Sequence, residues 1–154
     1  MFRKLTVIGS IIVVCLWNTG CSHSIIVQCS KLTGIIQSGN ALLETKAPYD
    51  AETTDKLGKD LNEIAQKVKA LELKDEKLQQ LRNRFYQVFQ KLSQEFMYMS
   101  SNLKTITQVE PSLEGRKKFH QAKAGITEAG EKASKFAVDE DTLVEELISY
   151  CKDK

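Results

Sequence analysis

The chain has 154 residues, of which 42% are hydrophobic and 27% charged, and these proportions are ordinary for one globular domain. The formal net charge is +2, but the two surplus cations, Arg3 and Lys4, lie within the first 20 residues. From Cys21 onward the chain is neutral, so it lacks the positive field that is typical of nucleic-acid-binding proteins. Only two prolines, Pro48 and Pro111, interrupt the sequence, which favours long helices.

The first 20 residues have the organisation of a signal peptide. A short basic start precedes the apolar run Leu5–Trp17, which is shorter than the roughly 20 residues that a membrane-spanning helix needs. The sequence Asn-Thr-Gly-Cys follows and ends at Cys21. It resembles the lipobox of bacterial lipoproteins, in which a Leu, a small residue and Gly or Ala precede the cysteine that is lipidated. Thr19, Gly20 and Cys21 match this pattern, whereas Asn18 stands where Leu is usual.

The resemblance implies that residues 1–20 are removed and that Cys21 carries a lipid anchor. The length of the chain predicts one domain over residues 21–154. The domain would then face the periplasm or a lumen. Ser22 follows the cysteine in place of the Asp associated with inner-membrane retention in enteric bacteria, which favours the outer membrane. Two alternatives stay open: a signal peptide that is cleaved without lipidation, and an N-terminal anchor that is not cleaved.

The remaining cysteines predict a disulfide. Cys15 would leave with the signal peptide and lipidation would consume Cys21, so Cys29 and Cys151 remain. Exported proteins in oxidising compartments tend to pair their thiols, and we expect a bridge between these two residues. The alternative is that both are buried thiols that behave as small hydrophobic side chains.

Apolar residues recur at helical spacing through the first half of the mature chain. The pattern predicts one helix over about residues 24–46 and a second over about 51–73, with a break at Pro48. No Gly or Pro marks the end of the second helix. We nevertheless place a turn at Lys74-Asp75, because Asp75 would otherwise lie on the apolar stripe and Asp is a good N-cap.

The second half predicts a long third helix over about residues 76–109, ended by Pro111, and a fourth over about 112–136. The acids at 139–141 then suggest a short last helix of about 12 residues, or a kinked continuation of the fourth. The third helix carries large apolar side chains. The fourth is small on its inner face, so we expect the two to pack closely through Ala122, either Gly125 or Ile126, Ala129 and Ala133.

Helices joined by short turns pack as antiparallel neighbours, so the sequence predicts an all-α, up-and-down four-helix bundle. With an even number of helices, the start of the first and the end of the last lie at the same end of the bundle. Cys29 and Cys151 would meet there, and the predicted fold and the predicted disulfide therefore support each other.

No pattern of catalytic residues occurs in the sequence: we find no nucleophile–base pair, metal-ligand set or phosphate loop, and expect neither an enzyme nor a cofactor. His23 and His120 are the only histidines and are too far apart to suggest a metal site. Arg116, Lys117 and Lys118, with Lys123, form a basic cluster that could contact lipid headgroups or an acidic partner. A solvated helix face is the ordinary interpretation of such a cluster.

Four further residues of the third helix fall off its main apolar stripe and are candidates for a partner or ligand surface, although a broad core face is the alternative: Tyr86, Phe89, Met97 and Tyr98. We interpret the chain as a lipid-anchored, non-catalytic binding protein of the cell envelope with a protein partner. The alternative function is a carrier that holds a small apolar ligand in a cavity lined by Phe85, Phe89, Phe96 and Ile126.

Overall fold

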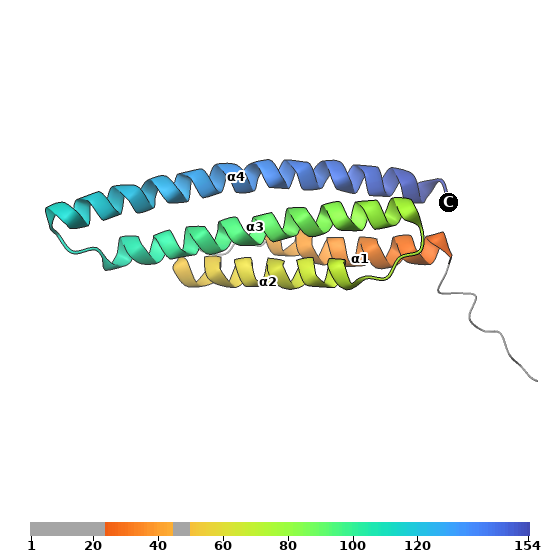
Figure 1. Ribbon diagram of the computed structural model, residues 1–154, viewed down its shortest axis with the longest axis horizontal. Coiled ribbons are helices and arrows are strands. Elements are labelled where there is room, and N and C mark those ends of the chain that lie inside the picture. Colours follow the sequence, from red (N-terminus) through yellow and green to blue (C-terminus); the bar gives the residue numbers. More distant parts are fainter. Residues whose placement is uncertain (1–23, 45–49) are drawn as a thin grey trace, which may run out of the picture.

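The computed structural model describes residues 24–44 and 50–154, so the signal peptide and the lipobox expected from the sequence lie outside the described residues. The described residues form four α-helices and no strand. Figure 1 shows them side by side in an elongated bundle. In chain order they are α1 (Ile25–Leu43), α2 (Ala51–Ala70), α3 (Glu76–Gln108) and α4 (Leu113–Lys152). The all-helical bundle predicted from the sequence is confirmed.

Each helix begins at a residue whose side-chain oxygen accepts a hydrogen bond from the backbone N–H three positions later. These N-caps are Ser24, Asp50, Asp75 and Ser112. Such a bond satisfies one of the donors that the first helical turn leaves without a partner. Asp75 therefore begins a new helix, and the turn predicted at Lys74-Asp75 is confirmed.

The turn between α2 and α3 contains neither glycine nor proline, and side chains of α1 and α3 hold its backbone in place. Gln28 of α1 is buried, and its Oε1 accepts hydrogen bonds from the backbone N–H groups of Lys74 and Asp75, at 2.6 and 3.1 Å. Arg82 of α3 donates to the carbonyl of Leu71 at 2.9 Å. Tertiary contacts thus replace the local turn chemistry that a sequence pattern could have shown.

Of the two alternatives for the stretch after Phe136, the separate last helix is wrong and the continuation of the fourth helix is confirmed, because α4 runs without interruption from Leu113 to Lys152. Neither Gly nor Pro stands between Phe136 and the acids at 139–141, so nothing in this stretch stops the helix. The acids are not a first turn. Glu140 among them is buried, with 3% of its surface exposed, and lies against α1.

The four helices differ in length, which divides the molecule into two regions. α1 and α2 have 19 and 20 residues, whereas α3 and α4 have 33 and 40. At the start of α2 the Ser100 hydroxyl donates to the Ala51 carbonyl at 2.6 Å, and beyond this level α3 and α4 continue as a pair (Figure 1). We call residues 101–127 the tip and the rest of the described chain the base.

The hydrophobic core lies in the base, where α1, α2, α3 and α4 surround it. Its fully buried side chains include Leu32, Leu61, Phe85, Phe89 and Leu147. Gly39 lets α1 approach α3, because a Cβ at this position would lie 2.6 Å from the Phe89 ring. Glu146 of α4 adds ion pairs with Lys77 and Arg84 of α3.

Candidate functional site

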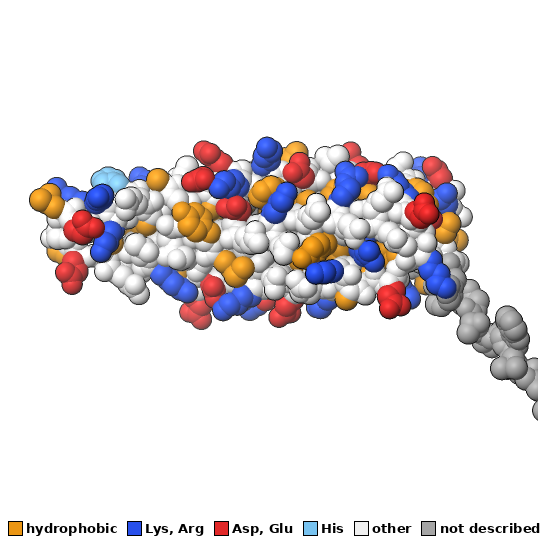
Figure 2. Space-filling model, in the orientation of Figure 1, with side chains coloured by type: hydrophobic (Ala, Val, Ile, Leu, Met, Phe, Trp, Pro, Cys, Tyr) orange, Lys and Arg blue, Asp and Glu red, His pale blue; other side chains and the backbone are white. Residues whose placement is uncertain are grey.

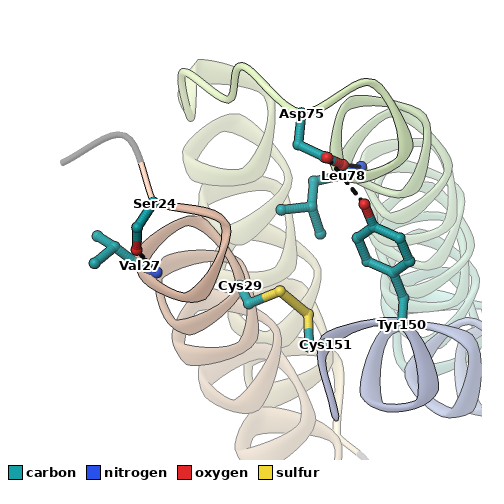
Figure 3. Close-up of a disulfide and its surroundings, with 7 residues drawn as sticks. All are labelled: Ser24, Val27, Cys29, Asp75, Leu78, Tyr150 and Cys151. Carbon is teal, nitrogen blue, oxygen red and sulfur yellow. Dashed lines mark hydrogen bonds between the residues drawn. A yellow bond between two sulfur atoms is a disulfide. The ribbon is translucent and has the colours of Figure 1, made fainter. Parts of the chain in front are cut away.

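Cys29 and Cys151 form a disulfide at the end of the base where α1 begins and α4 ends (Figure 3). Their Cα atoms are 5.9 Å apart and they are separated by 122 residues of sequence. The pairing expected from the sequence is therefore present. The bond joins the first and last helices, which make few other contacts with each other.

Asp75 extends this junction to α3. Its Oδ1 caps α3 by accepting from the Leu78 N–H, and its Oδ2 accepts from the Tyr150 hydroxyl of α4 at 2.9 Å (Figure 3). Donation to the Asp75 carboxylate raises the pKa of Tyr150, because the phenol would lose this bond on ionising. One acid thus ties together the start of α3 and the end of α4, one residue from the disulfide.

The four residues proposed from the sequence as a partner surface do not form one. Phe89 is fully buried opposite Gly39, and its assignment to a surface is wrong. Tyr86 is half-buried under Lys69, whose Nζ lies 5.1 Å from the ring centroid, and Met97 packs on Gly58 of α2. Only Tyr98 of the four is exposed. The physical reason is that α3 packs against both α2 and α4 and so needs a broad apolar face.

The tip carries exposed side chains of two kinds. The basic cluster anticipated from the sequence, Arg116, Lys117, Lys118 and Lys123, is exposed, as is His120. Leu113 and Phe119 are exposed beside it, by 86% and 37%. Figure 2 shows orange and blue side chains together at this end of the molecule. Sequence reasoning found the cations but not the two apolar residues, although both lie in the same short stretch.

Glu140 is a buried carboxyl group that sequence reasoning also missed. Oriented with its nitrogen toward this group, the Asn40 amide donates to Oε1 at 3.0 Å. Burial raises the pKa of Glu140 to about 7, because it penalises the charged form more than the Asn40 bond favours it. The sequence did contain a sign of burial, since Glu140 lies seven residues from both Ala133 and Leu147, which are core residues of α4.

Two pockets on the described residues are polar and open at the surface. One, of about 440 Å³, lies at the turn between α3 and α4 and is lined by Gln108, Glu110, Glu114 and Lys118 among others. The other, of about 270 Å³, lies between the same helices near Arg84 and Asp139. Neither has the largely apolar lining of a small-molecule site.

Within the described ranges no group of three or more His, Cys, Asp or Glu side chains is placed to hold a metal ion. None of the helices that these residues form combines the length and apolar character needed to cross a membrane.

Comparison with known proteins gives no match to this chain among family models, curated proteins or solved structures. The function is therefore inferred from the sequence and the geometry of the described residues.

Proposed function

We propose that this chain is a lipid-anchored, non-catalytic protein that acts by binding at an extracytoplasmic membrane face, which is the outer membrane in cells that have one. The Cys29–Cys151 disulfide is the observation that carries the proposal. Disulfides of this structural kind form and persist in oxidising compartments outside the cytoplasm. They agree with the export that the first 21 residues suggest.

The positions of the ends support an anchor at Cys21. The N-cap of α1, Ser24, follows that cysteine by three residues and lies at the end of the base that carries the disulfide. An α-helix rises about 1.5 Å per residue, so α4, with 40 residues, is roughly 60 Å long. Lipid on Cys21 would hold the base near one membrane and let the tip reach about this far from it.

The filled core favours a binding protein over a ligand carrier. Phe85 and Phe89, which would line the carrier's cavity, are both fully buried, and their rings stack with centroids 6.5 Å apart. Protein side chains therefore occupy the space between the helices at this level. The surface, and not the interior, is where we expect a partner.

Metabolic labelling with a fatty acid tests the anchor. We expect label on the wild-type chain and none on Cys21→Ala, which should accumulate as an unprocessed precursor or leave the membrane. Cys15→Ala is the matched control, because it removes a nearby cysteine within the apolar run and should keep the label. Equal labelling of the wild type and Cys21→Ala would contradict the proposal.

A further inference from the structure

Charge is unevenly distributed between the two regions. The tip contains five basic and two acidic side chains, a net charge of +3, and the rest of the chain from Cys21 onward has a net charge of −3. The overall neutrality of the mature chain therefore hides a basic end. This end lies opposite the disulfide and the start of α1 (Figure 1).

Several basic residues of the tip lie on the same face of α4 as the apolar residue Leu113. From Leu113, steps of three or four lead to Arg116 and Lys117, then to His120 and then to Lys123, so these residues lie along one side of the helix. All five are exposed. The opposite side packs against α3 and carries the buried residues Gly115, Ala122, Gly125 and Ala129.

The exposed apolar residues distinguish this face from an ordinary solvated one. Leu113 is 86% exposed at the very start of α4, and Phe119 is exposed beside the cations, with its ring edge-to-face against His120 at 5.8 Å. A helix that binds at a bilayer interface combines the same two features. Its cations contact anionic headgroups and its Leu or Phe side chains enter the boundary with the acyl chains.

We infer that the tip face formed by Leu113, Arg116, Lys117, Phe119 and Lys123 binds the surface of a bilayer that contains anionic phospholipids. Charge complementarity supplies the attraction. The face is convex because its residues project from one helix, so it can contact the flat surface of a bilayer but offers no groove to a peptide. This inference rests on the proposed function in one respect only. With Cys21 anchored in one membrane, the tip would link it to a second one about 60 Å away.

The test uses the full chain held in neutral phosphatidylcholine vesicles by its own N-terminal segment. These vesicles are passed over a second, supported bilayer of either phosphatidylcholine alone or phosphatidylcholine and phosphatidylglycerol in equal parts. We expect at least about tenfold more binding to the anionic bilayer, since each cation near such a surface adds attraction. Raising the salt concentration from about 0.1 M to about 1 M shortens the Debye length from about 10 Å to about 3 Å. This change should abolish most of the binding to the anionic bilayer.

Two variants separate charge from apolar contact. Arg116→Gln with Lys117→Gln should weaken binding to the anionic bilayer about tenfold, and Leu113→Ser alone should weaken it about fivefold. Lys135→Gln with Lys152→Gln is the matched control, because it removes two cations from the same helix outside the tip. It should bind as the wild type does.

Equal binding to neutral and anionic bilayers, or an equal loss in the control, would overturn the inference. So would vesicles that ignore phosphatidylglycerol but bind a supported layer that displays polyglutamate, which would assign the face to an acidic protein. Loss of the anchor gives a different result from loss of binding by the tip. Without the anchor, the phosphatidylcholine vesicles hold little protein. If the tip does not bind, the vesicles hold the protein but do not bind the supported bilayer.

Discussion

The base and the tip contain the same two helices, α3 and α4, yet they are built in different ways. In the base, large side chains such as Phe85, Phe89 and Leu147 are fully buried among α1, α2, α3 and α4. In the tip, the large apolar side chains of α3 are Leu103 and Ile106, and both are only half-buried. One pair of helices thus supplies a stable core at one end and an open surface at the other.

Small residues keep the tip folded without a large core. Gly115, Ala122 and Gly125 of α4 are buried, and a Cβ on Gly115 would lie 1.9 Å from the Glu110 carbonyl oxygen. Only a residue without a side chain permits this close turn. The small residues thus occupy the side of α4 that contacts α3, and Leu113 and the cations lie on the side that faces solvent.

The largest difference between the regions should appear on removing an aromatic ring from the base. Phe89→Ala should cost about 3–5 kcal/mol of unfolding free energy, because it leaves a cavity among α1, α2 and α3. Leu113→Ala in the tip should change that free energy by less than about 0.5 kcal/mol. Urea unfolding of both variants measures the contrast, and comparable losses would remove it.

Opening the disulfide should weaken the base next. The double variant Cys29→Ser with Cys151→Ser should lose about 2–5 kcal/mol, since the bond restricts a long loop of the unfolded chain and holds α1 against α4. Thermal melts under oxidising and reducing conditions measure this. As a control, the reduced wild type should have the same melting temperature as the double variant. A double variant with the melting temperature of the oxidised wild type would show that the bond contributes nothing to stability.

Glu140 should make the base less stable as the pH rises. Its pKa is about 4.5 when unfolded and about 7 when folded, so unfolding releases a proton between these values. The contribution of this group is greatest below about pH 4.5 and falls by up to about 3 kcal/mol by pH 7 and above. Glu140→Gln keeps an oxygen for Asn40 without the charge and should be more stable than the wild type at pH 8, but not at pH 4.

The pH experiment is best judged as a difference between the two proteins. Other acids, such as Glu146 in its ion pairs with Lys77 and Arg84, have a lowered pKa and stabilise the fold as the pH rises. They act equally in the wild type and in Glu140→Gln. If the unfolding free energies of the two proteins run parallel from pH 4 to pH 8, the pKa of Glu140 is the same in the folded and unfolded states and our assignment is wrong.

The smallest effect concerns the contact between α3 and α4 close to where the two regions meet. Ala129 is fully buried, so Ala129→Leu should cost about 1–3 kcal/mol by overpacking. Ala124 is exposed on the same helix, and Ala124→Leu should lie within about 0.5 kcal/mol of the wild type. Equal melting points for the two variants would contradict the packing described here.

The bundle could be predicted from the sequence because its signals are local and periodic. Apolar residues at steps of three and four marked the helices, Asp75 marked a cap, and Ala122 to Ala133 marked the close contact. The sequence could not decide between a separate last helix and a continuation of the fourth, because acids are favourable at a helix start but tolerated inside one. Only tertiary contact shows that Glu140 lies against Asn40.

The candidate surface was harder to predict for a related reason. Periodicity places Phe89 off the main stripe, but it cannot tell how many neighbours a helix has, and α3 packs against both α2 and α4. Leu113 follows the N-cap Ser112, where an apolar residue looks like the first of a core stripe. Its exposure follows from the unequal helix lengths, which leave no third helix of the described residues beside the tip.

Native-state hydrogen exchange along α4 tests the division most directly, because one helix passes through both regions. We expect backbone amides over residues 140–147 to exchange only through global unfolding, with the full unfolding free energy. Amides over residues 113–123 should exchange through local opening at a much lower free energy. The same opening free energy along the whole of α4, or a higher one in the tip, would contradict a stable base that carries an open binding end.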